Sequence, residues 1–455
     1  MNSSIDYAKL TKANVYLRNE LAGLLEKLPN GQFQFRYYDD WIKKSGAPIG
    51  FAFPTGSPPA RRDELFPFFD NLIPEGWLLK SVEAIYKIDK NNRFALLLAT
   101  GRETIGATKV IPLDANEKEY NFPLKEAAED SKDEIEYEIS FRCPNQACPY
   151  CLKKMTEAQI KKGSLGHDKC IKEMWGTTRK LKLKLNAKDP LASFRRTIKG
   201  ASISGAQRKG LFRLDKDLLQ ATSFNSKYIL KPNGEFPHLP ENEHLTMAIA
   251  KAVGFQVPPF TIFHHEKLGN VYAVKRFDVT DNGEHLRLED AAQILGYSVD
   301  DKYDASCNQL AEAIKSYSDA VKPDLVEMWR RLIFCFFTAN GDMHLKNWGF
   351  LEQGSLNGVF RLSPCYDLLN TRLPIPDEDI DIGLWLYEGK RKLTRELFLK
   401  FASELSIESF ALKEIAKIDQ WFETAKQLCM NSYLPEHLKI EYIKLVEERY
   451  QILKG

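Results

Sequence analysis

Several features that would mark particular classes of protein are absent from this 455-residue sequence. No apolar run reaches the roughly 20 residues that a membrane-spanning helix requires. The first residues, MNSSIDYAKL, lack the apolar core of a secretory signal. The formal net charge is only +2, so overall charge does not predict direct binding to nucleic acid. We therefore expect a cytoplasmic globular protein without a membrane partner.

Cysteine is also scarce, with eight residues, which argues against a disulfide framework. Four of the eight lie close together between Cys143 and Cys170. Cys148 and Cys151 have the spacing of a zinc knuckle, and His167 and Cys170 repeat it. We predict that these four residues bind one structural Zn²⁺. Cys143 is a fifth candidate that a tetrahedral site cannot hold, and reduced free thiols are the alternative.

The length allows two or three domains, and 44% hydrophobic with 28% charged residues is typical of a soluble globular protein. Residues 1–113 contain alternating patterns of strands. The segments VYLRNELAGLLEKL and QFQFRYYDDW, separated by Pro-Asn-Gly, predict a hairpin, and a helix is expected near Gly76. We expect three aromatic residues of this region to lie in its core rather than on a binding face: Phe66, Phe68 and Phe69.

An acidic stretch, 114–142, is a candidate linker, and the cysteine-containing segment with its connector occupies 143–196. The basic residues that follow the cysteines are expected to form a solvated face. Beyond them the pattern changes to short strands, among them YILKP, PPFTIF and NVYAVKRFD, with a helix in ENEHLTMAIAKAVGF. From Leu325 onward the sequence is mostly helical.

The most informative stretch runs from Phe336 to Leu351. An apolar run leads to Asn340-Gly341, where a turn with left-handed backbone is expected. Asp342, His344, Lys346 and Asn347 follow, and a second loop contains Asp367 between apolar flanks: these polar side chains make up the candidate site. Phosphoryl transfer depends on positioning and charge neutralisation, and this set of residue types could provide both.

In this interpretation Asp342 accepts the proton of the attacking hydroxyl, and Asn347 and Asp367 supply oxygen ligands to Mg²⁺. The alternative is that Asp342 and Asn347 are turn residues and Asp367 caps a helix. Lys231, at the end of YILKP, could pair with nucleotide phosphates. The combination, with apolar strands on both sides, favours an active site.

Several motifs together resemble the HipA family, bacterial serine/threonine kinases of toxin–antitoxin systems. They are SISGAQ (202–207), YILKP, VKRFD, LEDAAQILG, GDMHLKN and CYDLLN, in that order, with VYLRNELAG, FRYYDDW and FFDNLIPEG nearer the amino terminus. The resemblance covers most of the chain. The cysteine–histidine segment resembles the start of shorter HipA relatives, so the chain resembles a full-length form with an internal zinc-knuckle-like insertion.

The resemblance implies an α+β, two-lobed kinase fold related to phosphatidylinositol kinases. It also implies an additional β-rich amino-terminal subdomain (1–113), an N-lobe (197–290) and a helical C-lobe (291–455). Asp342 would be the catalytic base, and Asn347 and Asp367 the Mg²⁺ ligands. The residues that would contact ATP are Lys231, Ser204, Gly205, Ala206, Gln207, Lys275, Phe277 and His344. Ser202 would be the regulatory autophosphorylation site that switches the kinase off, and Ser204 is a second candidate phosphosite.

The implied substrate is a translation component such as an aminoacyl-tRNA synthetase. The implied partner is a small helix-turn-helix antitoxin, through which the kinase would reach DNA only indirectly. Arg208 and Lys275 depart from the family pattern, where acidic residues are common. The rival hypothesis is a catalytically weak kinase-fold scaffold within an antitoxin–DNA repressor complex.

Overall fold

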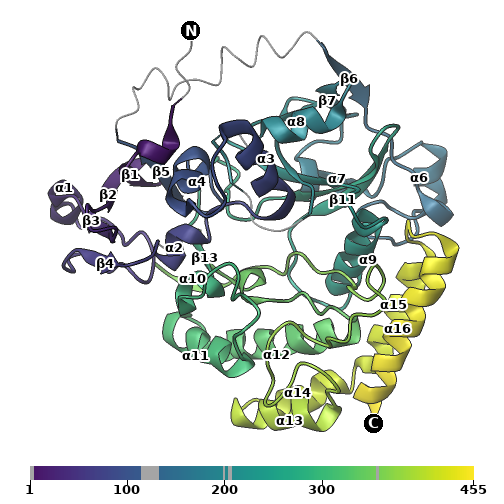
Figure 1. Cartoon of the computed structure of the whole chain (residues 1–455). Helices are drawn as coiled ribbons and strands as arrows, with labels where there is room; N and C mark the ends of the chain where they lie inside the picture. The colour runs from purple at the N-terminus through teal and green to yellow at the C-terminus, as the bar shows by residue number, and fades with distance from the viewer. Residues whose placement is uncertain (1–4, 114–132, 198–199, 203–206, 355–357) are drawn as a thin grey trace.

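The computed structural model describes residues 5–113, 133–197, 200–202, 207–354 and 358–455. Within these ranges the chain forms three β-sheets. An amino-terminal part and a central sheet lie above a helical carboxy-terminal part in the view of Figure 1.

The amino-terminal part is built on a five-stranded antiparallel sheet with the order β4-β3-β2-β1-β5. Alternate residues of β1 face the core, as a half-buried strand requires. The strands are β1 (Lys12–Leu17), β2 (Glu20–Lys27), β3 (Phe33–Tyr37), β4 (Ala60–Arg62) and β5 (Thr108–Pro112). The helical elements are η1 (Tyr7–Lys9), α1 (Asp39–Lys43), α2 (Pro67–Asp70), α3 (Gly76–Tyr86) and α4 (Arg93–Thr100).

The predicted hairpin is more finely divided than the sequence pattern indicates. Arg18 and Asn19 have φ angles of 50° and 66°, and they form a two-residue turn that splits its first segment into β1 and β2. Such turns need positive φ at both central positions. The helix at Gly76 is confirmed, and the three predicted core aromatics are at most 8% exposed: Phe66, Phe68 and Phe69.

The central sheet has seven strands in the order β11-β12-β10-β8-β9-β7-β6. Only β7 and β9 pair in parallel among its described strands. The strands are β6 (Glu134–Glu138), β7 (Lys182–Asn186), β8 (Gly210–Asp215), β9 (Leu218–Ala221), β10 (Tyr228–Pro232), β11 (Phe260–His265) and β12 (Gly269–Lys275). Helices of the connector are α6 (Glu157–Lys161), α7 (Asp168–Trp175) and α8 (Pro190–Arg196), after η4 (Pro144–Gln146).

Two strands of this sheet come from segments expected to be a linker and a connector. β6 lies at the end of the acidic stretch, and β7 lies in the basic one. Lys182 pairs with Glu136 at 2.8 Å, and Lys184 pairs with Glu134 at 3.1 Å. The two runs of opposite charge therefore match across neighbouring strands, where opposite charges are favourable. The described end of the expected linker is thus part of the sheet.

The carboxy-terminal part is helical around a small antiparallel sheet, β13-β14-β15. Its strands are β13 (Leu288–Asp290), β14 (Gly349–Glu352) and β15 (Phe360–Leu362). Its helices are α10 (Ala291–Leu295), α11 (Cys307–Tyr317), α12 (Val321–Phe337), η5 (Leu345–Asn347), α13 (Arg395–Glu404), α14 (Glu408–Ile415), α15 (Ile418–Met430) and α16 (Glu436–Lys454). The predicted helix α9 (Leu239–Ala252) packs between β11–β12 and α15.

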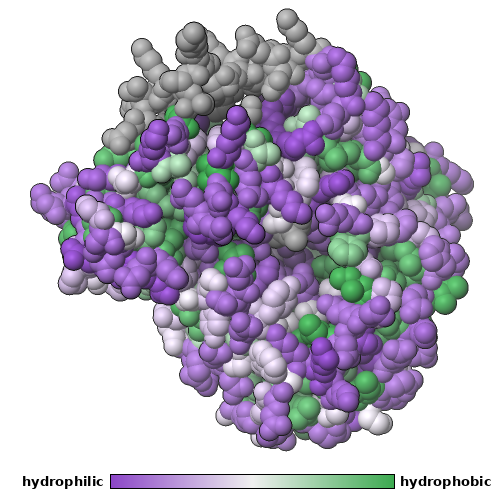
Figure 2. Space-filling model, viewed as in Figure 1, coloured by the Kyte–Doolittle hydropathy of each residue, from purple (hydrophilic) through white to green (hydrophobic). Residues whose placement is uncertain are grey.

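Hydrophilic side chains dominate the face shown in Figure 2. Across the described part of the chain, no helix is both long and apolar enough to span a bilayer.

Candidate active site

The loop after α12 carries the first group of predicted site residues. Ala339, not Asn340 or Gly341, adopts the left-handed backbone, with φ 53°. The expected turn is present, but the position assigned to it was wrong. Asn340 Oδ1 accepts a hydrogen bond from the Asp342 amide at 3.1 Å, and Thr371 Oγ1 accepts one from the Gly341 amide at 3.0 Å. Because side chains hold its backbone amides, the loop presents Asp342 from a defined position.

Asn347, on η5, fixes the same loop from its other end. Its Nδ2 donates to the main-chain carbonyl oxygen of Asp342 at 2.9 Å. Because Nδ2 is engaged, Oδ1 is the amide atom left to act as a ligand, and Asn347 lines the central cavity. The Asp342 side chain is 41% exposed, so its carboxylate remains reachable.

Asp367 and Lys231 meet across the cavity, although 136 positions separate them. Lys231 Nζ lies 2.5 Å from Asp367 Oδ1 and 2.6 Å from Glu243 Oε1. Burial lowers the pKa of Lys231, but the two carboxylates outweigh burial and raise it, so the amine is charged. Burial raises the pKa of Asp367, yet Lys231 and Lys209 bring it down to about 2. Asp367 is therefore an anion at neutral pH.

Glu243 and Lys209 were not predicted. Glu243 lies on α9, and burial raises its pKa to about 7 despite the attraction of Lys231. Lys209 precedes β8 and is 2% exposed, and burial lowers its pKa to about 8. Both belong to segments, ENEHLT and QRKGL, whose patterns do not distinguish a buried charge from a solvated one. The site thus has two lysines rather than one beside Asp367.

A cavity of about 240 Å³ joins these groups. The structure describes nine of the residues that were predicted to bind ATP or Mg²⁺, to act as the catalytic base or to be phosphorylated, and all of them line the cavity. They are Ser202, Gln207, Lys231, Lys275, Phe277, Asp342, His344, Asn347 and Asp367. Ser204, Gly205 and Ala206 lie outside the described residues. Phe277 packs on Tyr366 with 5.3 Å between ring centroids, so the lining contains an aromatic pair as well as charged groups. Such a lining suits a ligand with a flat apolar base and anionic groups.

Tyr303 is a further residue that the sequence pattern did not reveal. Its hydroxyl donates a hydrogen bond to Asp342 Oδ1, and its ring packs edge-on against His344 at 5.0 Å. His344 is 5% exposed, and burial lowers its pKa to about 4, so it is neutral at pH 7. His344 therefore packs beside the Asp342 carboxylate without adding a charge.

Ser202 is held by the amino-terminal part of the chain. It is 3% exposed, its hydroxyl donates to the carbonyl oxygen of Leu72, and its amide donates to the carbonyl oxygen of Glu103 at 2.7 Å. The predicted regulatory serine thus lies at an interface, where a modifying group requires local opening of the structure.

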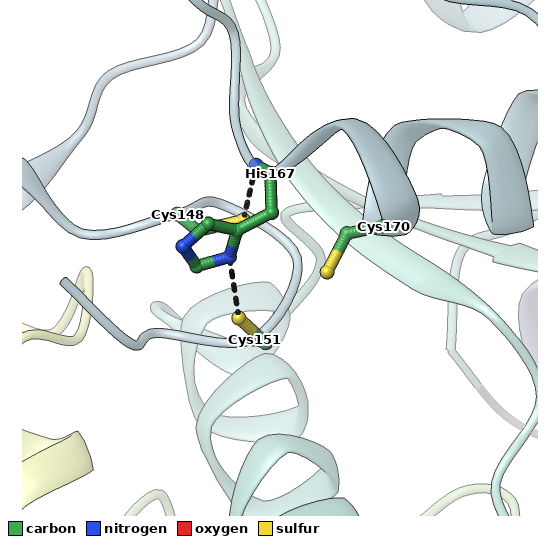
Figure 3. A group of neighbouring side chains, drawn as sticks. All are labelled: Cys148, Cys151, His167 and Cys170. Carbon is green, nitrogen blue, oxygen red and sulfur yellow. Dashed lines mark hydrogen bonds between the residues drawn. The ribbon is translucent and has the colours of Figure 1, made fainter. Parts of the chain in front are cut away.

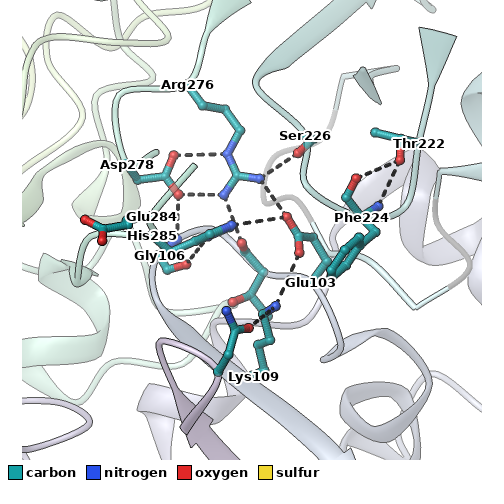
Figure 4. A network of polar contacts seen from close by, with 12 residues as sticks. Glu103, Gly106, Lys109, Thr222, Phe224, Ser226, Arg276, Asp278, Glu284 and His285 are labelled. Atoms are coloured by element: carbon teal, nitrogen blue, oxygen red, sulfur yellow. Dashed lines mark hydrogen bonds and ion pairs between the residues drawn. The ribbon is translucent and has the colours of Figure 1, made fainter. Parts of the chain in front are cut away.

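The segment with Lys275 and Phe277 continues into a buried polar network (Figure 4). Arg276 donates to both carboxylate oxygens of Asp278, at 3.0 and 2.6 Å, and its Nη2 reaches the carbonyl oxygen of Thr104 at 3.0 Å. Glu103 lies 3.4 Å from Arg276 Nη1. The network therefore attaches this wall of the cavity to the amino-terminal part.

The predicted metal ligands also converge. The ligand atoms of Cys148, Cys151, His167 and Cys170 all lie within 4.8 Å of one another (Figure 3). Cys151 Sγ is 3.4 Å from His167 Nδ1. Hydrogen bonds from the Cys148 and Cys170 thiols lower the pKa of Cys151, which favours the thiolate that binds metal. Among the described residues, Cys143 is not part of this group.

Backbone geometry supports the same interpretation of the cluster. Gly166 has φ 145°, and a Cβ there would lie 2.9 Å from the Tyr150 ring and 3.1 Å from Cys148 Sγ. A side chain at this position would collide with the Tyr150 ring and crowd the Cys148 thiol. Glycine therefore allows the backbone to pass close to this member of the cluster.

Comparison with known proteins identifies the family. The model described as HipA-like C-terminal domain matches residues 201–429, and the HipA N-terminal domain matches 13–111. The chain belongs to the HipA family. It is similar to a putative kinase of Sinorhizobium fredii, with 26% identity over 391 residues that cover 82% of this chain and 80% of the relative.

A second relative is the serine/threonine-protein kinase toxin HipA of Shewanella oneidensis, 26% identical over 366 residues, covering 74% of this chain and 70% of the relative. A solved structure of Shewanella oneidensis HipA, in a complex with HipB and operator DNA, matches with a TM-score of 0.67 at 20% identity. It covers 96% of both chains. This likeness confirms the predicted two-lobed α+β HipA fold with a helical carboxy-terminal lobe.

Proposed function

We propose that this HipA-family chain is an ATP- and Mg²⁺-dependent serine/threonine protein kinase of the toxin type. One observation carries the proposal. Asp342 and Asn347 from one loop and Asp367 from another line one cavity together with Lys231, whose amine pairs with Asp367 at 2.5 Å. This is the set of groups that phosphoryl transfer requires.

Each group has a role that follows from its surroundings. Asp342, exposed at the cavity and fixed by its loop, accepts the proton of the acceptor hydroxyl. Lys231 and Lys209 attract the nucleotide phosphates, and Glu243 orients Lys231. The aromatic pair of Phe277 and Tyr366 takes the adenine.

The donor atoms fit Mg²⁺. The Asn347 amide oxygen and the Asp367 carboxylate are hard oxygen ligands, and Asp367 is anionic because its pKa is about 2. When bound, Mg²⁺ would neutralise charge on the phosphate oxygens. Lys231 engages Asp367 Oδ1, so the other carboxylate oxygen would be the one offered to the cation.

The experiment is phosphoryl transfer from labelled ATP, measured for the natural chain and for Asp342→Asn. We expect the variant to lose roughly a thousandfold or more in rate, because a positioned base that accepts the acceptor proton is lost. Asp419→Asn, a surface change on α15, is the matched control and should retain full activity. Equal transfer by the natural chain and Asp342→Asn would refute the assignment.

Nucleotide binding separates the kinase from a scaffold. A ligand that binds only the folded state raises apparent stability, so ATP with Mg²⁺ should increase the melting temperature. A chain that is stabilised by neither ATP nor ATP with Mg²⁺ would support the scaffold instead.

Ser202 is our proposed regulatory phosphosite. A phosphate there adds almost two negative charges and cannot keep the hydroxyl's hydrogen bond to Leu72, so the start of the loop must leave its position. Ser202→Asp should therefore weaken ATP binding by at least about tenfold, as measured by titration. Unchanged affinity would contradict the switch.

The related HipA of Shewanella oneidensis was solved in a complex with HipB and operator DNA. On that basis we propose that a small DNA-binding antitoxin is a partner and that DNA is contacted through it. The substrate we propose is a serine or threonine of a translation protein such as an aminoacyl-tRNA synthetase. Phosphoproteomics after induced expression, with Asp342→Asn as the control, would identify it.

We also propose one structural Zn²⁺ bound by Cys148, Cys151, His167 and Cys170, since three thiols and an imidazole form a closed tetrahedral donor set. Elemental analysis should find about one zinc per chain. Cys170→Ala should lose it, whereas the matched control Cys143→Ala should keep it. Equal zinc content in both variants would refute this ligand set.

A further inference from the structure

A short segment of the amino-terminal subdomain lies against the loop that carries Asp342. We call residues 71–75 the clamp segment. The Asn71 carbonyl oxygen accepts a hydrogen bond from Lys346 Nζ at 3.1 Å, and Asn71 Nδ2 donates to the carbonyl oxygen of Tyr297 at 2.9 Å. Asn71 and Leu72 line the central cavity. The amino-terminal subdomain therefore forms part of the wall of the candidate active site.

Glu75 makes the strongest contacts of the clamp segment. One carboxylate oxygen lies 2.8 Å from Lys346 Nζ, and the other lies 2.7 Å from Lys302 Nζ. The Glu75 side chain is 9% exposed, and that of Lys346 only 1%. Burial raises the pKa of Glu75, but the two lysines outweigh burial and lower it, so the carboxylate is charged at all ordinary pH values.

Each of the two lysines belongs to a segment that contacts Asp342 or follows it in the same loop. Lys346 lies on η5, between His344 and Asn347. Lys302 immediately precedes Tyr303, whose hydroxyl donates to Asp342 Oδ1. The Glu75 carboxylate thus connects η5, which ends at the predicted Mg²⁺ ligand Asn347, with the segment whose Tyr303 contacts the predicted base.

We propose that Glu75 is a positioning residue for phosphoryl transfer: the amino-terminal subdomain aligns the Asp342 loop through Glu75 and its two lysines. The inference rests on the proposed kinase function. Without the carboxylate, two buried amines lose their counter-ion and must move toward solvent. Displacement of a reacting group by about 1 Å can cost roughly a hundredfold in rate.

The experiment compares Glu75→Gln with the natural chain in steady-state phosphoryl transfer. We expect kcat to fall by at least about tenfold, because alignment is lost, while KM for ATP changes by less than about threefold. Glu75 itself does not line the central cavity, so the change acts on the site through Lys346 and Lys302. Glu75→Asp, which keeps the charge on a shorter side chain, should recover a substantial part of kcat.

Glu352→Gln is the matched control. Glu352 also joins the two parts of the chain, since it pairs with Arg287 at 2.7 Å and with Arg18 of the amino-terminal subdomain. Its side chain is fully buried, and it does not line the central cavity. We expect Glu352→Gln to lower the melting temperature at least as much as Glu75→Gln while it retains kcat within about threefold, since its contacts lie away from the reacting groups.

Three results would overturn the inference. Glu75→Gln could retain kcat within about twofold, or Glu352→Gln could lose kcat equally, which would make the loss a general effect of a weakened interface. Alternatively, Glu75→Asp could be as inactive as Glu75→Gln at equal folded fraction. Failure of the natural chain to transfer phosphate would remove the proposed function as well, whereas transfer by both the natural chain and Glu75→Gln would remove only the role of Glu75.

Discussion

Two ionic clusters contribute to the lining of the cavity, and they differ in how far their carboxylates are buried and paired. In the network of Figure 4, the side chains of Arg276 and Asp278 are 1% and 3% exposed. Asp278 accepts hydrogen bonds from Arg276 and from the Gly106 amide at 2.7 Å. In the candidate active site, Asp342 and Asp367 remain 41% and 34% exposed. The Asp278 carboxylate of the first cluster is buried and paired, whereas the two carboxylates of the second cluster are exposed enough to bind a ligand.

This difference separates a structural role from a chemical one. A buried charge pair stabilises little on balance, but removal of one partner leaves the other uncompensated and destabilises the fold strongly. A carboxylate that keeps part of its surface exposed is not fully paired within the protein, so it remains available to a cation or a proton. Substitutions in the two clusters should therefore affect different quantities.

The largest effect should come from Asp367→Asn. The change removes the anionic ligand from the cavity, so phosphoryl transfer should fall by roughly a thousandfold or more. Stability should fall less than for a fully buried pair, because the buried Lys231 keeps its second partner, Glu243. Initial rates with labelled ATP and a thermal melt measure both quantities. If the rate of the variant stays within about tenfold of that of the natural chain, Asp367 has a structural role like that of Asp278.

Asp278→Asn should have the opposite profile. It leaves the Arg276 guanidinium without its bidentate partner, so the free energy of unfolding should fall by roughly 3–5 kcal/mol in denaturant titrations. Asp281→Asn is the matched control, since Asp281 pairs with Lys275 at 3.0 Å but its side chain is 89% exposed. Equal stability of the two variants would remove the distinction between the clusters.

Lys209 offers a smaller effect that depends on pH. Its pKa is lowered to about 8 by burial, so the amine is charged below pH 8 and loses its charge above it. ATP affinity of the natural chain should therefore fall as pH rises from 7 to 9. Lys209→Met should bind about tenfold more weakly at pH 7 and show a flatter pH dependence, measured by calorimetric titration. Parallel pH profiles would count against a role for this amine.

The smallest effect concerns Glu289, which accepts a hydrogen bond from the Phe51 amide at 2.8 Å. Burial raises its pKa from 4.5 to about 8. Between these values the folded state keeps a proton that the unfolded state has released, so this carboxyl lowers stability as pH rises. Glu289→Gln should melt a few degrees higher than the natural chain at pH 8 but not at pH 4.5. An equal difference at both pH values would contradict the assignment.

Local patterns in the sequence were sufficient for several elements. Periodicity predicted α9, and the start of α3 at Gly76 also followed from it. Residue type and spacing also nominated Asp342, Asn347 and Asp367, and the pairs Cys148–Cys151 and His167–Cys170, and the structure brings each set together in one place. Local signals did not reveal the Arg18–Asn19 turn, because arginine is not a common residue with positive φ.

Other features depended on contacts between distant segments. The strand nature of β6 followed from its pairing with β7, and the buried positions of Lys209 and Glu243 followed from packing around the cavity. The contact of Tyr303 with Asp342 and that of Glu75 with Lys346 are of the same kind. The sequence by itself determined which chemical groups the protein carries and their local spacing. Only the tertiary structure decided which of them are buried and paired, because burial and electrostatic contact depend on neighbours that chain folding brings from far along the sequence.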